Sequence, residues 1–279
     1  MSAVSHPATT RVSPAFLAGG GEMGARMRAL DWAKTPLGEP ETWPQSLKTI
    51  VRVMLDSRYA MWMLWGPEYT FFCNDAYLPT VGLKREWVLG ARSDSVWAEI
   101  WPDIHPRIAR VLEHGEATWD EALLLFLERS GFSEETYHTF SYSPVYDDDG
   151  RIMGMLCVVT EVTERVLDER GLRVLRDLAS RVSGTQTVEV VCSRLMDVLR
   201  DDPADIPFAL LYVLEQSPPH ALLLASCGQL PASLRPERIT LNDEQSPWPL
   251  IQAIDRSDAL SVELPAGTAS IHAPLWADR

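Results

Sequence analysis

The sequence predicts an α+β protein, in which an antiparallel sheet is combined with short helices and a smaller α+β unit follows. Three observations point to this class. Short apolar and aromatic runs, bounded by Gly, Pro, Asn and Asp, recur between residues 58 and 162 and are typical of strands. A charged helical pattern with few breakers comes next. The length of 279 residues, with 46% hydrophobic and 23% charged residues, suits two globular domains.

Composition and cysteine spacing exclude several classes of function. A formal net charge of −14 argues against a phosphate-binding surface, so we expect no nucleic-acid partner. Cys73, Cys157, Cys192 and Cys227 never form a Cys-x-x-Cys pair, which argues against a disulfide framework and a metal site. The longest apolar runs are far too short to span a bilayer, and no leader pattern opens the chain. We therefore expect a cytoplasmic protein with no membrane partner.

Five segments are expected along the chain. They are a disordered lead-in at residues 1–18, a helical extension at 19–57, the first domain at 58–162, a linker helix at 163–184 and a partial second domain at 185–279.

The helical extension begins with a run that formally spells G-x-G-x-x-G, between Gly19 and Gly24. A dinucleotide site would need a strand ending at these glycines, and residues 13–17 are a poor strand with no βαβ unit after them. We interpret the run as a flexible entry to a helix over 25–32. Thr42 and Gln45 suit a capping box for a second helix. Its apolar stripe should pack on the first domain, and comprises Leu47, Ile50, Val51, Met54 and Leu55.

The first domain is expected to contain five strands and several helices. Strands are predicted at residues 61–65, 69–73, 116–127, 135–146 and 151–160, with short helices at 75–101 and a longer helix at 102–114. Asp147 to Gly150 closes the last two strands as a turn, because Asp-Gly suits positive φ. A calcium loop is the alternative interpretation, but Arg151 stands where an oxygen ligand is wanted and the spacing fails.

The stretch from Phe71 to Gly82 is the most informative in the chain. An aromatic strand runs into Asn74 and Asp75, a helical turn containing Tyr77 follows, and Gly82 breaks it. Asn74 can bond backbone groups at the end of the strand, and Gly82 tolerates a positive φ. This order of strand, turn, strand, helices and hairpin resembles a PAS domain.

Beyond residue 163 the pattern changes to a helix and then a second unit. Leu172, Leu175, Ala179 and Val182 are spaced as in a two-stranded coiled coil, and we call these four residues the seam. Packing of this helix on its own domain is the alternative. A helix at 188–199, strands at 208–214 and 221–227, a helix at 249–254 and strands at 259–264 and 270–276 then resemble the first part of a GAF domain.

Motifs across residues 19–215 resemble the N-terminal sensory region of bacterial sensor and hybrid histidine kinases. These motifs are Gly19–Gly24, Asp31-Trp32, Thr35-Pro36-Leu37-Gly38, Trp43-Pro44-x-Ser46-Leu47, Trp65-Gly66-Pro67, Asn74-Asp75-Ala76-Tyr77, Trp97-x-Glu99-Ile100-Trp101, Ala117-Thr118-Trp119, Glu134-Glu135-Thr136-Tyr137, Phe140-Ser141-Tyr142-Ser143-Pro144 and Thr160-Glu161-x-Thr163-Glu164-Arg165.

The resemblance implies a signal-sensing and dimerisation module of a two-component histidine kinase. Its implied partners are a second copy of the chain and the downstream kinase domains of a longer parent protein. The sequence itself shows no acceptor-histidine motif, ATP-lid pattern or P-loop. We therefore expect no catalytic site in this chain.

A small cavity in the first domain would hold a small-molecule ligand or be a filled core, and both readings stay open. Its predicted lining comprises Met63, Phe72, Ile108, Val111, Phe126, Phe140, Tyr142, Met155 and Cys157. The cofactor is unknown, and we expect none to be covalently bound. No cysteine follows Asn74 as a flavin photoreceptor would need, and residues 1–72 contain no cysteine for a bilin.

Haem ligated by His105 or His114 is the alternative cofactor, because both lie on the predicted helix at 102–114. Another histidine, His138, is close in sequence to Ser141 and Ser143. Strand alternation places His138 on the opposite face from both serines, which argues against a nucleophile and base pair.

Overall fold

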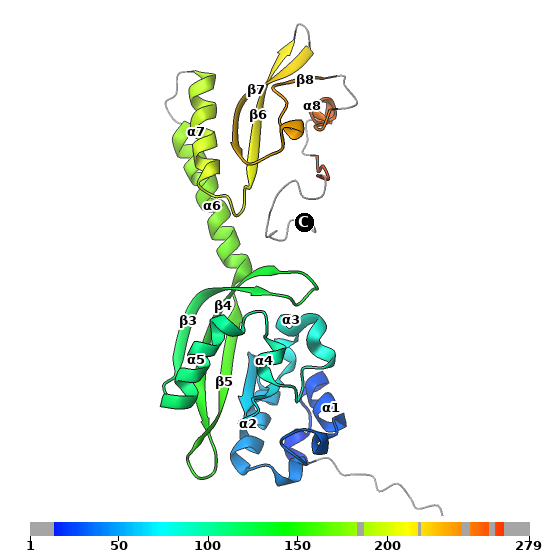
Figure 1. Ribbon diagram of the computed structural model, residues 1–279, viewed down its shortest axis with the longest axis vertical. Coiled ribbons are helices and arrows are strands. Elements are labelled where there is room, and N and C mark those ends of the chain that lie inside the picture. Colours follow the sequence, from blue (N-terminus) through cyan, green and yellow to red (C-terminus); the bar gives the residue numbers. More distant parts are fainter. Residues whose placement is uncertain (1–13, 183–186, 217–218, 242–245, 257–259, 265–279) are drawn as a thin grey trace, which may run out of the picture. The chain divides into compact units, whose positions relative to one another are not determined.

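The computed structural model describes residues 14–182, 187–216, 219–241, 246–256 and 260–264, and its contacts divide the chain into two compact units. One unit ends at Thr163 and the other begins at Glu164. The α+β class is confirmed, with a separate antiparallel sheet in each unit (Figure 1).

The first unit is built on a five-stranded antiparallel sheet of order β2-β1-β5-β4-β3. Its strands are β1 (Ala60–Trp65), β2 (Thr70–Cys73), β3 (Thr118–Leu127), β4 (Glu134–Tyr146) and β5 (Ile152–Glu161). The predicted strands are confirmed to within two residues at their ends. Because β5 pairs with β1, the end of the unit lies in the middle of the sheet, beside its first strand.

Short helices between β2 and β3 cover one face of the sheet. They are η4 (Asp75–Tyr77), α3 (Leu78–Val81), η5 (Gly82–Glu86), α4 (Ser93–Val96) and α5 (Trp101–His114). Ile104, Ile108 and Val111 form the buried stripe of α5, which packs on β4 and β5. Gly82 has a φ of +58°, as predicted, and a Cβ there would lie 2.3 Å from the carbonyl oxygen of Arg129.

The N-terminal extension packs against β1 and β2 on the other face. It consists of η1 (Ala15–Leu17), α1 (Gly21–Ala29), η2 (Trp32–Lys34), η3 (Pro40–Thr42) and α2 (Gln45–Asp56). Trp32 stacks on Phe72 with ring centroids 5.3 Å apart. Leu17 is buried, so the disorder expected as far as residue 18 does not apply to this segment, while residues 1–13 lie outside the described part. The extension and the sheet share one hydrophobic core.

Both helices of the extension begin differently from the prediction. The first starts at Gly21 rather than at residue 25. The predicted capping box at Thr42 and Gln45 is wrong: the Thr42 hydroxyl donates to the carbonyl of Glu39. Instead, the Asp148 carboxylate accepts hydrogen bonds from the amides of Gln45 (2.9 Å) and Ser46 (2.7 Å). Sequence rules for caps consider only local residues, and this cap comes from the β4–β5 turn.

That turn, at residues 147–150, is confirmed. Gly150 has a φ of +82°. One carboxylate oxygen of Asp147 accepts hydrogen bonds from the amides of Asp149 (2.9 Å) and Arg151 (2.8 Å). Backbone amides therefore bond the carboxylates of Asp147 and Asp148, two of the three acidic side chains that the calcium interpretation would assign to an ion.

The second unit combines helices with a three-stranded antiparallel sheet of order β6-β7-β8. Its elements are α6 (Thr163–Val182), whose first residue belongs to the first unit, α7 (Val188–Arg200), β6 (Phe208–Gln216), β7 (Pro219–Gly228), η6 (Ala232–Leu234), β8 (Arg238–Thr240) and α8 (Leu250–Arg256). The three-residue strand β8 was not predicted. The strand expected at 259–264 is wrong over residues 260–264, which form no strand, and the one at 270–276 lies outside the described residues.

Among the residues that the structure describes, no helix combines the length and the apolar character needed to cross a bilayer.

Candidate functional site: an aromatic cavity around His138

A small internal cavity lies between the sheet and the short helices of the first unit. The centre of a water-sized sphere can occupy a volume of about 20 Å³ in this cavity, which is enough for one ordered water. Its lining comprises Trp62, Tyr77, Thr80, Trp97, Ile100, Ile104, Leu125, Leu127, His138, Phe140, Tyr142, Cys157 and Val159. The walls are therefore mostly aromatic and aliphatic, with a few polar atoms.

His138 is the polar centre of this lining. Its side chain is only 3% exposed, and neither ring nitrogen has a hydrogen-bond partner. The nearest carboxylate oxygen, Oε2 of Glu161, lies 3.9 Å from Nε2, too far for a hydrogen bond. Burial lowers the pKa of His138 to about 4, and the charge of Glu161 opposes this shift while that of Arg129 adds to it. The imidazole is therefore neutral at pH 7.

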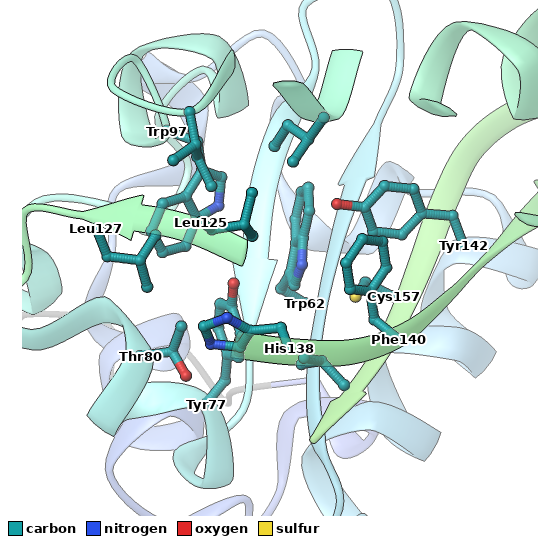
Figure 2. Close-up of a pocket in the computed structure, with 13 residues that line it drawn as sticks. Trp62, Tyr77, Thr80, Trp97, Leu125, Leu127, His138, Phe140, Tyr142 and Cys157 are labelled. Carbon is teal, nitrogen blue, oxygen red and sulfur yellow. The ribbon is translucent and has the colours of Figure 1, made fainter. Parts of the chain in front are cut away.

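Strand alternation explains why His138 points inward. Along β4, residues at even positions from Glu134 to Tyr142 are buried and those between them are half-buried. His138 thus shares the cavity face with Phe140 and Tyr142, whereas Ser141 and Ser143 lie on the other face, as predicted. Figure 2 shows the imidazole pointing toward Tyr77 and Thr80.

Other polar atoms in the cavity wall also stay uncharged. Burial raises the pKa of Tyr77 and of Tyr142 well above the usual value. The indole nitrogen of Trp97 is buried and has no hydrogen-bond partner. The cavity therefore presents neutral hydrogen-bonding groups in a low-dielectric setting.

Of the nine predicted lining residues, the structure brings Phe140, Tyr142 and Cys157 to the cavity. The other six do not line it. Ile108 and Val111 are buried on α5, one and two turns beyond Ile104, which does. Met155 is buried two residues along β5 from Cys157. Met63, Phe72 and Phe126 each lie one residue away from a strand position whose side chain faces inward.

The displacement on β1 and β2 arises because both faces of these strands are buried. Trp62 and Phe71 stack on each other with ring centroids 5.6 Å apart, and Trp62 lines the cavity. Met63 pairs with Phe72, which packs against Trp32 of the extension. When both faces are apolar, the sequence carries no alternation from which to read the inward face.

The displacement on β3 has a different cause, a β-bulge. The pairing with β4 shifts between Asp120 and Leu123, and Ala122 has a φ of +49°. Straight alternation from Asp120 would turn Phe126 inward. The extra residue reverses the faces, so that Leu125 and Leu127 line the cavity and Phe126 is 41% exposed.

The two histidines considered as haem ligands do not line the cavity. His105 is half-buried, with its ring 5.3 Å from that of Trp101, and His114 is exposed at the end of α5. The histidine that the fold brings to the cavity is His138, on a strand.

Asn74 and Asp75 join the cavity wall to the extension. Asn74 is buried; its Oδ1 accepts from the amide of Met61 (3.0 Å), and its Nδ2 donates to the carbonyls of Met54 (3.0 Å) and Tyr59 (2.8 Å). The Asp75 carboxylate accepts hydrogen bonds from the first-turn amides of α1. Two residues later in the same short helix, Tyr77 lines the cavity.

A cluster of charges lies where β5 leads into α6. The Arg129 guanidinium donates to both carboxylate oxygens of Glu161 (2.7 and 3.0 Å) and to Glu134 (2.8 Å). The Thr163 hydroxyl donates to Glu161 (2.9 Å) and accepts from the amide of Tyr137 (2.9 Å). Burial acts to raise the pKa of Glu161, but its bonds with Arg129 outweigh burial and lower it.

The predicted seam on α6 faces solvent. Leu172 and Leu175 are 66% and 63% exposed, and Ala179 is also exposed. The side chain of Val182 is not among those that the structure describes. Val174 and Leu178, on another side of the helix, are half-buried.

Residues 55–167, which contain the whole five-stranded sheet, match the family model of the PAS fold. This part of the chain therefore has the PAS fold.

Several solved structures are similar to the chain. The PAS domain of BvgS from Bordetella pertussis is 22% identical, with a TM-score of 0.35 over 47% of this chain and 97% of that one. A sensory box sensor histidine kinase from Vibrio cholerae is 16% identical, with a TM-score of 0.30 over 43% and 94%. An RNA-binding light-oxygen-voltage receptor is 22% identical, with a TM-score of 0.36 over 53% of this chain and only 42% of the receptor. No curated protein matches.

Proposed function

We propose that the chain is the signal-sensing input of a two-component histidine kinase, in which the state of the PAS cavity is passed to the linker helix α6. The observation that carries this proposal is a short series of contacts from the cavity to the start of α6. His138 lines the cavity, Glu161 lies 3.9 Å from it, and the Glu161 carboxylate accepts from the hydroxyl of Thr163, the first residue of α6.

The proposed mechanism is a shift between two arrangements of Glu161. In the structure, Arg129 and Thr163 share its two oxygens. A change in the cavity that alters the hydrogen bonding or the charge of His138 changes the competition for Glu161. When the Thr163 hydroxyl keeps Glu161 as its acceptor, the first turn of α6 is stabilised. When it loses Glu161, that turn frays. A ligand acts on this equilibrium only through its different affinity for the two arrangements.

Hydrogen exchange of the full chain tests this coupling without any ligand. Leu125→Ala enlarges the cavity and should speed amide exchange in residues 164–172. In a Thr163→Val background, Leu125→Ala should not change the exchange rates of these amides relative to Thr163→Val alone. Met63→Ala, on the other face of the sheet, is the matched control for general destabilisation. Equal exchange in residues 164–172 for wild type and Leu125→Ala would refute the proposed transmission.

The kinase assignment is supported by the motif set shared with histidine-kinase sensory regions. The second unit, with a helix before an antiparallel sheet, supports a GAF-like domain between the PAS domain and the kinase. A chimera that joins this chain to a histidine-kinase catalytic core tests the assignment. Its autophosphorylation should differ between wild type and Leu125→Ala inputs, and identical rates would contradict a kinase-input role.

We further propose that the working unit is a homodimer formed through the seam. Two leucines more than 60% exposed, at coiled-coil spacing on a helix whose other side is half-buried, favour a second copy of α6 as their partner.

A further inference from the structure

The cavity contains hydrogen-bonding atoms that the fold leaves unused. Both ring nitrogens of His138 and the indole nitrogen of Trp97 are buried without a partner. Buried polar groups of this kind are normally paired, by protein or by an ordered molecule. The fold alone therefore leaves these atoms unpaired, and His138 contributes two of the three.

The charges around the cavity restrict what can complete it. None of the lining residues is Asp, Glu, Lys or Arg, and His138 is neutral. The nearest carboxylate to His138, that of Glu161, is held by Arg129. Lys84 does not line the cavity, but its ammonium lies 4.7 Å from the ring centroid of Trp97. Its positive charge would repel a second cation bound at that ring. An ion would enter without a counter-charge, so the occupant must be uncharged.

The aromatic rings around His138 restrict the shape of a molecule that could occupy the cavity. Trp62, Tyr77, Trp97, Phe140 and Tyr142 line the cavity, and Trp62 lies within 6.5 Å, centroid to centroid, of Tyr77, Trp97 and Tyr142. Flat, apolar surfaces of this kind suit an aromatic body. The present space holds about one water, so a larger guest has to part these rings, and its entry changes the structure around it.

We propose that His138 is the hydrogen-bonding anchor of this cavity for an uncharged small aromatic molecule that carries a hydroxyl group. A neutral imidazole accepts a hydrogen bond at one nitrogen and donates one at the other, which matches a hydroxyl group. The proposal rests on the sensory function proposed above and adds the class of ligand to it.

Phenol and toluene are the probes that test the anchor, because they share a ring and differ by the hydroxyl. Binding to the full chain at pH 7.5 is followed by ¹⁵N shifts of the His138 ring and by Trp fluorescence. Wild type should prefer phenol over toluene by about five- to tenfold, the worth of one net hydrogen bond. The preference should vanish in His138→Phe and return in His138→Gln, which keeps a neutral donor and acceptor.

Benzoate and benzylamine, an anion and a cation of similar size, should bind more weakly than phenol. Equal affinity for phenol and toluene in wild type, tighter binding of either ion, or binding of none of the four probes would each overturn the proposal. A preference for phenol that persists in His138→Phe would place the anchor elsewhere and overturn it too. The exchange experiment on residues 164–172 uses no probe, so transmission to α6 succeeds or fails independently of these results.

Discussion

The Asp75 carboxylate lies where a side chain on Gly21 would be. A Cβ at Gly21 would be 1.8 Å from Oδ2 of Asp75, and the same carboxylate accepts the amides of Glu22 (2.9 Å) and Met23 (2.7 Å). The glycine run is thus a helix N-terminus whose anion is supplied by the protein itself. The run is thus an entry to a helix, as the sequence predicts, and the helix begins at Gly21.

Gly21→Ala should therefore destabilise the protein by about 2–4 kcal/mol, because it combines a left-handed φ of +56° with a clash against Asp75. Urea unfolding measures the change. Gly19→Ala is the matched control: its φ is +75°, but nothing lies within 4 Å of the added Cβ, so only backbone strain of about 1 kcal/mol is expected. Equal losses for the two variants would show that Asp75 does not occupy this position.

Acidification should destabilise the protein through His138. Its pKa is about 4 in the folded state and about 6.5 in the unfolded chain, so the unfolded chain binds the proton first. The stability is complete above pH 6.5 and falls as the pH drops from 6.5 toward 4, by up to about 3 kcal/mol. Unfolding of wild type and His138→Phe between pH 7 and 5 measures this. A parallel decline in both proteins would assign the loss to other groups.

Ala122→Gly should stabilise the protein slightly. Ala122 sits at the β3 bulge with a φ of +49°, a conformation that glycine adopts without strain. We expect a gain of about 0.5–1 kcal/mol in urea unfolding, the balance of relieved strain and extra chain entropy. A loss of stability instead would mean that the bulge is absent in solution.

Leu175→Glu should shift the protein toward monomer, because it places a charge in the seam where a second copy of α6 would bury it. Sedimentation velocity over a range of concentrations measures association. Ser180→Glu adds the same charge at an exposed position off the seam and should leave association unchanged. The same association state for wild type and Leu175→Glu would remove the seam as the dimer contact.

The order of elements in the PAS domain could be predicted because each strand and helix carries its own local signal. Asp-Gly marked the β4–β5 turn, and the 3.6-residue stripe marked α2. Inward and outward faces could be predicted only where one face is polar, as on β4, where His138 alternates with Thr139. The bulge at Ala122 left no signal in residue type, because alanine is not expected at positive φ.

Contacts between distant segments were beyond sequence reasoning. Asp148 caps a helix more than a hundred residues earlier, and Asp75 caps one more than fifty residues earlier. From the sequence alone His138 is only a candidate base, and strand alternation argues against that role. The signal that would have selected it is a lone histidine on the apolar face of a strand, between Thr136 and Phe140.

The shared core of extension and sheet decides where this chain can be cut. The family match begins at residue 55, yet Trp32 and Trp43 cover Phe72 from before that point. A fragment trimmed to the match would expose the outer faces of β1 and β2 and lose the helices that Asp75 and Asp148 cap, so we expect it to aggregate. Domain swaps and isolated-domain measurements should therefore use fragments that start before η1, because the extension and the sheet share one core.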